Sequence, residues 1–172
     1  MKKISFQNNV LPLKNELYRL ALRITLNPAE AEDVVQETMI KVWNRREQWE
    51  QIESMEAFCL AICRNLALDK SKRQEFLNQS LDQDVYEAPD KSYSSNPEEQ
   101  AMQQDRISLI RKLIDNLPEK QRSVMQLRDV EGKTYKEIAS IMEITEEQVK
   151  INIYRARQSI KQKYLETEKY GL

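Results

Sequence analysis

Apolar residues near the C-terminal end of the chain follow a helical period. Residues 134–163 contain two short segments in which apolar side chains recur three or four residues apart. Thr134 and Thr145 each precede one of these segments, and each is followed three residues later by Glu or Gln, as in a capping box. The pattern therefore predicts a helix, a tight turn and a second helix. The residues expected to face inward are Ile138, Ala139, Met142, Val149, Ile153, Ala156 and Ile160.

The turn between these two helices lacks the glycine that such turns often contain. Its residues are Met142, Glu143 and Ile144. If Glu143 adopts the left-handed conformation, the strain is on the order of 1 kcal/mol. We expect the packing of the turn to offset that strain.

The rest of the chain predicts further amphipathic helices. Apolar spacing indicates helices over residues 13–26, 28–43, 98–116 and 118–131, and a more completely apolar one that begins at residue 55. Asn27 and Pro28 form a typical helix start, and Ser54 is suited to cap the helix after it. Periodicity fades over residues 44–53, which predicts a helix end and a loop.

An acidic, proline-containing stretch divides these helices into two groups. Residues 81–105 hold seven acidic side chains against Lys91 alone, a net charge of −6. Residues 78–97 also lack periodic apolar positions, as a linker does. We therefore predict an all-α protein with two small helical domains, 1–77 and 98–172, joined by a flexible acidic linker over 78–97. The second domain contains the helix-turn-helix.

Composition argues against catalysis and against a membrane protein. The 172 residues include no histidine, which removes the commonest general base and metal ligand, and no glycine-rich phosphate loop. We expect no enzyme activity, cofactor or metal. Cys59 and Cys63 lie in an apolar run and are expected to be buried thiols in a reducing cytosol. No apolar stretch approaches the length of a membrane span, so we expect a cytoplasmic protein without membrane insertion.

The second helix of the predicted pair has the charge of a DNA-binding helix. Residues 148–163 carry five basic side chains and no acidic one. In a helix-turn-helix, the second helix enters the major groove while flanking cations contact phosphates. The alternative is a solvated basic face on an ordinary helix pair. The basic residues are Lys150, Arg155, Arg157, Lys161 and Lys163.

Three segments in order resemble one known family. They are DVVQETMIKVW at 33–43, FCLAICRNLALDKSKR at 58–73, and the stretch from LPEKQRSV to NIYRAR at 117–157. Together they resemble a bacterial RNA polymerase sigma factor of the extracytoplasmic-function type, within the sigma-70 family. The resemblance covers about residues 10–77 and 98–165. It implies a factor that binds core RNA polymerase, directs promoter-specific transcription initiation, and is held by an anti-sigma factor.

The resemblance assigns the first segment to polymerase binding. The matched positions implied to contact the clamp helices of the largest polymerase subunit are Asp33, Gln36, Glu37, Lys41 and Trp43. Two alternatives stay open from the residues alone. An acidic face is also what a good helix N-terminus carries, and Trp43 could be a core anchor.

The second segment is implied to recognise the minus-ten element. Arg64 and Asn65 match positions that border a pocket for a flipped base, and the loop 48–54 matches the segment that closes it. Trp49 is either a stacking platform for a base or a buried staple. Backbone contacts are implied for Lys70, Lys72 and Arg73, although cations at a helix C-terminus are also stabilising for their own sake.

The third segment is implied to bind the minus-thirty-five element. Ile151 could meet a thymine methyl group or face inward, and Asn152 could meet an adenine edge. Many relatives have Thr where this chain has Gln148, so base preference does not transfer. The residues assigned to this element are Lys133, Lys136, Thr145, Lys150, Ile151, Asn152, Arg155 and Arg157.

Two other functions fit a helix-turn-helix. One is an autonomous regulator whose N-terminal domain senses a ligand or dimerises, and the other is a decoy that binds polymerase without recognising a promoter. The first two segments occur together in this chain, and no effector domain requires that pairing. We therefore favour the sigma factor.

Overall fold

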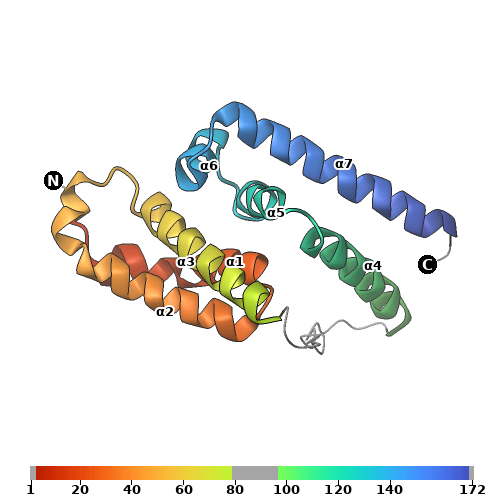
Figure 1. Ribbon diagram of the computed structural model, residues 1–172, viewed down its shortest axis with the longest axis horizontal. Helices are drawn as coiled ribbons and strands as arrows, with labels where there is room; N and C mark the ends of the chain where they lie inside the picture. Colours follow the sequence, from red (N-terminus) through yellow and green to blue (C-terminus); the bar gives the residue numbers. More distant parts are fainter. Residues whose placement is uncertain (1–2, 79–96, 171–172) are drawn as a thin grey trace.

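The computed structural model describes residues 3–78 and 97–170, and every regular element within these ranges is helical (Figure 1). This confirms the predicted fold class. Most of the predicted linker, residues 79–96, lies outside the described residues. The elements are η1 (Phe6–Val10), η2 (Leu11–Leu13), α1 (Lys14–Thr25), α2 (Pro28–Asn44), η3 (Arg46–Gln51), α3 (Met55–Asn78), α4 (Pro97–Asp115), α5 (Glu119–Met125), η4 (Gln126–Val130), α6 (Tyr135–Met142) and α7 (Glu146–Tyr170).

Helices α1, α2 and α3 pack on one another as the N-terminal domain. The chain turns sharply between α1 and α2, because Leu26 adopts the left-handed conformation with φ 56°. Asn27 then caps α2: its side-chain oxygen accepts a hydrogen bond from the Glu30 N–H at 3.1 Å. Pro28 is the first helical residue, as predicted.

The start of α3 is also capped as predicted, and its first half is buried. The Ser54 hydroxyl accepts a hydrogen bond from the Ala57 N–H at 3.1 Å. Cys59 and Cys63 are free, fully buried thiols, and burial raises the pKa of each to about 12. Cys63 Sγ donates to the Leu17 carbonyl oxygen at 3.3 Å. These thiols therefore stay protonated and belong to the core.

The C-terminal domain consists of α4, α5, α6 and α7, with α7 contacting the other three. The single helix predicted over 118–131 is instead α5 followed by the π-helical turn η4. It still ends at Gly132, which has φ 71°. The cap of α7 is a complete capping box: the Gln148 N–H donates to the Thr145 hydroxyl at 3.1 Å, and the Gln148 side chain accepts from the Thr145 N–H at 3.0 Å.

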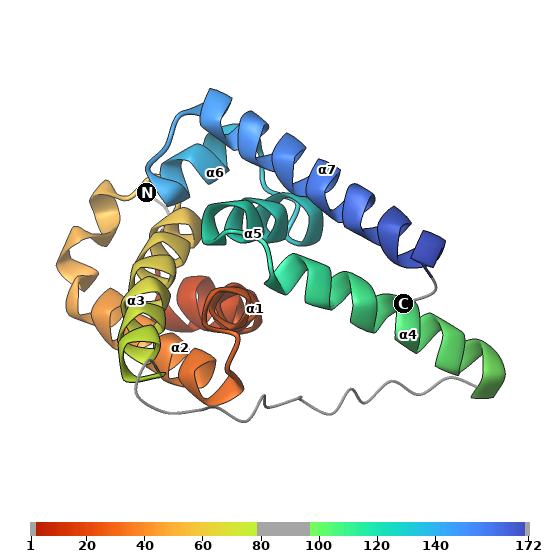
Figure 2. The same cartoon turned by 45° about the vertical axis from the view of Figure 1, so that its right-hand side comes forward.

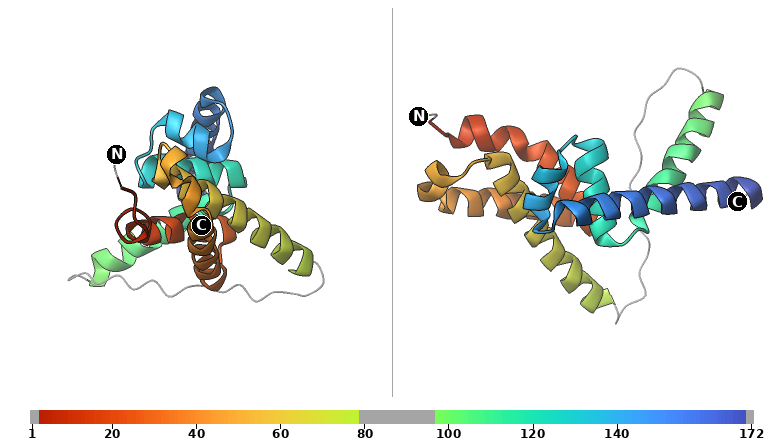
Figure 3. Two further views of the ribbon diagram at one scale, coloured as in Figure 1. Left: turned by 90° about the vertical axis from the view of Figure 1, so that its left-hand side faces the viewer. Right: turned by 90° about the horizontal axis from the view of Figure 1, so that it is seen from above.

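The two domains contact each other directly (Figures 2 and 3). Helix α6 packs on α3, while α5 and η4 pack on α1. Buried apolar residues from both domains form one contact cluster. Helix α7 and helix α4 extend away from this contact on the side opposite α2 (Figure 2). The N-terminal domain therefore covers one side of the helix-turn-helix.

In the turn between α6 and α7, Glu143 adopts the left-handed conformation, the case for which we expected strain. Glu143 has φ 56° and ψ 45°, and the Ile144 N–H donates to the Ala139 carbonyl oxygen at 3.1 Å. The Glu143 side chain is exposed, so its replacement removes no buried contact.

Glu143→Gly should stabilise the protein by about 0.5 to 1 kcal/mol. Glycine avoids the left-handed strain, and this gain exceeds the larger backbone entropy that glycine loses on folding. Urea unfolding followed by circular dichroism measures the change. Glu143→Ala is the matched control, since it removes the same carboxylate and keeps the Cβ. Equal stability of the two variants would show that the turn is not strained.

Candidate functional site

The outer face of α2 presents the residues assigned to polymerase binding. Asp33, Gln36, Glu37 and Lys41 are all exposed. Trp43, 47% exposed, packs edge-on against Phe6 and Trp49, with ring centroids 5.7 and 6.1 Å apart, and lies under the Arg46 guanidinium. Trp43 is therefore both a packing residue and part of the surface.

Ile40 belongs to the same face and was missed from the sequence. It is 59% exposed, and it lies four residues after Gln36 and three before Trp43, on one side of the helix. An exposed isoleucine in this row extends the apolar part of the face. The helical spacing from Gln36 to Trp43 was the signal that could have identified it.

Lys70 is paired with α2, although the sequence grouped it with Lys72 and Arg73 as a phosphate contact. Its Nζ lies 3.3 Å from a Glu37 carboxylate oxygen, 3.8 Å from Glu30 and 4.0 Å from Asp33. Lys72 and Arg73 remain exposed. In this structure Lys70 therefore compensates the acidic face, and only the two later cations are open to DNA.

Trp49 is buried, with 6% of its surface exposed. Its Nε1 donates to the Val42 carbonyl oxygen at 3.1 Å, near the end of α2. The prediction that Trp49 stacks on a DNA base is therefore wrong for this arrangement, and the alternative, a buried packing residue, is correct. The indole fixes η3 against α2, because the polar N–H gains a partner while the rings fill the core.

Arg64 and Asn65, expected to act together, lie in different environments. Asn65 is exposed, whereas Arg64 is 8% exposed. Arg64 Nη2 donates to Glu119 of α5 at 3.3 Å, and Arg64 Nε has no hydrogen-bond partner among the described residues. The prediction that Arg64 is available to DNA is wrong for this structure, because α5 covers it.

Helix α7 exposes a surface with basic and apolar side chains opposite its buried stripe. Lys150, Ile151 and Arg155 are exposed, and the 47% exposure of Ile151 excludes the inward alternative. Tyr154, which was missed, is 66% exposed between them. Its position three residues after Ile151 and one after buried Ile153 could have identified it. Lys136 and Thr145 are also exposed beside this surface.

Two residues assigned to the minus-thirty-five element have partners within the domain. Asn152 Nδ2 donates to the Gln148 carbonyl oxygen at 2.7 Å. Arg157 is ion-paired with Asp129 of η4, and this hydrogen bond raises the pKa of the guanidinium. In this structure the Asn152 amide and the Arg157 guanidinium therefore each have a partner within the domain.

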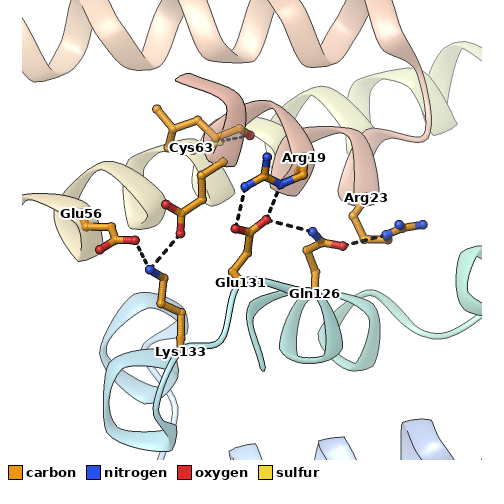
Figure 4. Close-up of polar contacts among 9 residues, drawn as sticks. Arg19, Arg23, Glu56, Cys63, Gln126, Glu131 and Lys133 are labelled. Atoms are coloured by element: carbon orange, nitrogen blue, oxygen red, sulfur yellow. Dashed lines mark hydrogen bonds and ion pairs between the residues drawn. The ribbon is translucent and has the colours of Figure 1, made fainter. Parts of the chain in front are cut away.

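Lys133, assigned to a phosphate, lies in the contact between the domains. Its ammonium group is 3.0 Å from Glu16 of α1 and is also ion-paired with Glu56 of α3 (Figure 4). The side chain is 12% exposed. The phosphate role is therefore not available in this arrangement.

Further charged residues line the same contact (Figure 4). Arg19 binds Glu131 through two hydrogen bonds, 2.6 and 2.8 Å long. Arg23 lies 3.0 Å from Asp115 and 3.2 Å from the Gln126 side chain. We call the whole set the interdomain ion-pair cluster. It consists of Arg19–Glu131, Arg23–Asp115, Arg64–Glu119, Lys133–Glu16 and Lys133–Glu56.

Neither a metal centre nor a membrane span emerges from residues 3–78 and 97–170. Within these ranges the His, Cys, Asp and Glu side chains form no group of three or more that could bind a metal. Their helices also lack the combined length and hydropathy needed to cross a bilayer. The candidate functional features of the described residues are therefore the charged and aromatic surfaces of α2 and α7.

Two family models match the chain. The model of sigma-70 region 2 matches residues 10–76, and the model of sigma-70 region 4 matches residues 107–160. The first therefore covers the N-terminal domain with both α2 and α3. The second covers the helix-turn-helix, α5 and the C-terminal part of α4 from residue 107.

Several curated proteins are similar over most of the chain. SigL, an ECF RNA polymerase sigma factor of Mycobacterium tuberculosis, is 30% identical over 146 residues, which is 84% of this chain and 80% of SigL. SigE of Mycolicibacterium smegmatis is 32% identical, covering 86% of this chain and 56% of SigE. RfaY of Xanthomonas campestris, a probable RNA polymerase sigma factor, is 30% identical, covering 91% and 40%. The chain thus spans less than two thirds of SigE and RfaY.

The fold is shared with solved structures. The sigma factor RpoE from Bartonella quintana, solved with the anti-sigma factor NepR, matches 91% of this chain and 94% of that chain, with a TM-score of 0.73 and 22% identity. CnrH, solved with the cytosolic domain of CnrY, matches 91% and 84%, with a TM-score of 0.63 and 18% identity. These matches extend across both domains.

Proposed function

We propose that this chain, which belongs to the extracytoplasmic-function RNA polymerase sigma factors, binds core RNA polymerase and directs promoter-specific transcription initiation. One observation supports this most strongly. An exposed acidic and aromatic face on α2 and an exposed basic surface on α7 occur in the same chain, on separate domains. A protein with both can bind a second protein and DNA at once.

The face of α2 is proposed to dock on the clamp helices of the largest polymerase subunit. Asp33 and Glu37 supply negative charge, while Ile40 and Trp43 supply apolar area at the same face. Interfaces of this kind place aromatic anchors among charged residues that set orientation. Cations of the partner would compete with Lys70 for the α2 carboxylates, which would free Lys70 for the DNA backbone.

Promoter recognition is proposed to use both domains. Asn65, Lys72 and Arg73 are exposed on α3, where unpaired minus-ten bases and the backbone would lie. Ile151 and Tyr154 lie at the centre of the exposed face of α7, where side chains enter the major groove of the minus-thirty-five element. Lys150 and Arg155 flank this centre and would contact phosphates.

The remaining assignments follow from this role. We propose that the functional domains are 1–77 and 98–172 with the linker 78–97 between them, and that the protein works in the cytoplasm without catalytic activity or a cofactor. An anti-sigma factor is proposed as a further partner, because RpoE, which has the same fold, was solved with one bound.

Gln36→Ala combined with Glu37→Ala should abolish polymerase-dependent transcription. If this pair contributes about 2 kcal/mol, as interface hot spots do, the affinity for core polymerase falls roughly thirtyfold. Fluorescence anisotropy with purified core polymerase measures the affinity, and sequencing of the transcripts made in vitro measures initiation.

Glu32→Ala is the matched control, because Glu32 is exposed on the same helix outside the polymerase-binding set. It should change neither core affinity nor transcription. Unchanged transcription by the double variant, together with tight promoter binding by the free protein, would favour the autonomous regulator instead.

Arg155→Ala should flatten the salt dependence of DNA binding by about one counterion, whereas Arg157→Ala should change it less. Both residues are exposed arginines of α7, but Arg157 is ion-paired with Asp129. The logarithm of the DNA affinity of the polymerase holoenzyme, plotted against the logarithm of salt concentration, gives the slopes. Equal slopes for the two variants would contradict the surface assigned to α7.

A further inference from the structure

Two cations converge on one aromatic ring where η4, α6 and α7 meet. The Arg128 guanidinium carbon lies 4.6 Å from the centroid of the Tyr135 ring, and the Lys150 ammonium nitrogen lies 5.8 Å from it. Both distances are within the roughly 6 Å over which an aromatic face attracts a cation. Arg128 belongs to η4, Tyr135 is the first residue of α6, and Lys150 belongs to α7. One ring therefore holds cations that come from two other elements.

The Tyr135 ring has a fixed place in the domain. Tyr135 is partly buried and packs against the hydrophobic core, and its backbone begins α6, whose capping hydrogen bond is 3.1 Å long. Arg128 has a second fixed contact, because its Nη1 donates to the Lys133 carbonyl oxygen at 2.8 Å. The Lys150 side chain, by contrast, is exposed, and without the ring it would sample many rotamers. The ring therefore orders a side chain that the rest of the domain leaves free to move.

The kind of partner decides how much of a cation's charge remains for DNA. Arg157 of α7 is ion-paired with Asp129, and the carboxylate opposes its charge. Among the described residues, neither Lys150 nor Arg128 has a carboxylate within ion-pair distance, and both lie over Tyr135 instead. A tyrosine ring is neutral, so it fixes the position of a cation and leaves its full charge to a phosphate. The Tyr135 site thus orders two cations without neutralising them.

We propose that Tyr135 is a positioning residue, which preorganises Lys150 and Arg128 for the phosphates of bound DNA. The proposal rests on the proposed function, which assigns Lys150 to a phosphate, and it adds Tyr135 as the residue through which that contact is prepared. Ordering a long side chain at an interface costs affinity, because rotamer freedom is lost on binding. A side chain that the ring already holds in the free protein does not lose that freedom a second time. Tyr135 therefore raises DNA affinity without touching DNA.

Tyr135→Leu removes the aromatic face and keeps an apolar side chain at the partly buried position. The affinity of the polymerase holoenzyme for promoter DNA should fall about threefold or more, which is the cost of ordering the released side chains. The salt dependence of that affinity should keep its wild-type slope, because both cations are still present and still reach phosphates. Lys150→Ala removes a cation and should instead flatten the slope by about one counterion. Tyr135→Phe keeps the ring and should retain most of the affinity.

A double-mutant cycle separates positioning from a general loss of structure. Lys150→Ala should cost less affinity in the Tyr135→Leu protein than in the wild type, because the ring no longer prepares the contact that Lys150 makes. Arg155→Ala is the matched control, since Arg155 is an exposed cation of the same helix and is not one of the two cations over the Tyr135 ring. Its cost should be the same with Tyr135 and with Leu at that position.

Nuclear magnetic resonance of the free protein tests the geometry without DNA or polymerase. Protons held over an aromatic ring resonate upfield, so the Lys150 ε-methylene and Arg128 δ-methylene signals should be shifted upfield in the wild type and in Tyr135→Phe. In Tyr135→Leu both signals should move to the positions of exposed side chains such as Lys136 and Arg155. Circular dichroism measures whether Tyr135→Leu keeps its helical content. If that variant fails to fold, the signals of the wild type and of Tyr135→Phe still decide.

Three results would each overturn the proposal: an unshifted Lys150 signal in the wild type, additive losses in the Lys150 cycle, or a Tyr135→Leu holoenzyme that binds promoter DNA as tightly as the wild type or more tightly. Tighter binding would mean that the ring competes with DNA for the cations. A wild-type holoenzyme that binds no promoter DNA would refute the proposed function and, with it, the purpose of the pair. Promoter binding that is equal in the wild type and in Tyr135→Leu would refute this inference alone.

Discussion

The arrangement of this protein depends on one constraint: a guanidinium or ammonium group taken out of water needs an anion beside it. Arg64 of the N-terminal domain is buried under α5, and Glu119 of that helix supplies the carboxylate beside it. In the opposite direction, Lys133 of the C-terminal domain is ion-paired with Glu16 and Glu56 of the N-terminal domain. Each domain therefore supplies carboxylates that pair with cations of the other domain. The resemblance to the family assigns these same two cations to DNA contacts, so the proposed promoter binding and the placement of the domains involve the same side chains.

Several cations that we propose to contact DNA thus already have an anionic partner inside the chain. Lys70 lies against the acidic face of α2, and Arg157 lies against Asp129. The formal net charge of the chain is −1, so acidic residues nearly balance the basic ones. The basic side chains can therefore pair with carboxylates of the same chain when DNA is absent. On α2, a docking polymerase would displace Lys70 from the carboxylates of Glu30, Asp33 and Glu37. We therefore expect docking on α2 to come first and full DNA contact to follow.

Local features were predictable because they depend on neighbours in sequence. The caps at Asn27, Ser54 and Thr145 follow from residue type and spacing alone, whereas the left-handed conformation of Glu143 was only one possibility for a turn without glycine. The π-helical turn after α5 did not follow, because its apolar pattern suits an ordinary helix equally well. Arg64 and Lys133 were correctly seen as cations, but their partners lie 55 and 77 or more residues away. The periodicity of apolar residues carries no information about such distant pairings. The burial of Arg64 and Lys133 by the other domain therefore could not be predicted from the sequence.

The most direct test of this account is carbodiimide cross-linking, which joins amines to carboxylates already in contact. The free protein should form an amide between Lys133 and Glu56 or Glu16, detected by peptide mass spectrometry. In a transcriptionally active complex with core polymerase and promoter DNA, that cross-link should fall to background, because Lys133 has left the α1–α3 face. An undiminished cross-link in the active complex would contradict the account, since initiation would then proceed with the two domains still closed.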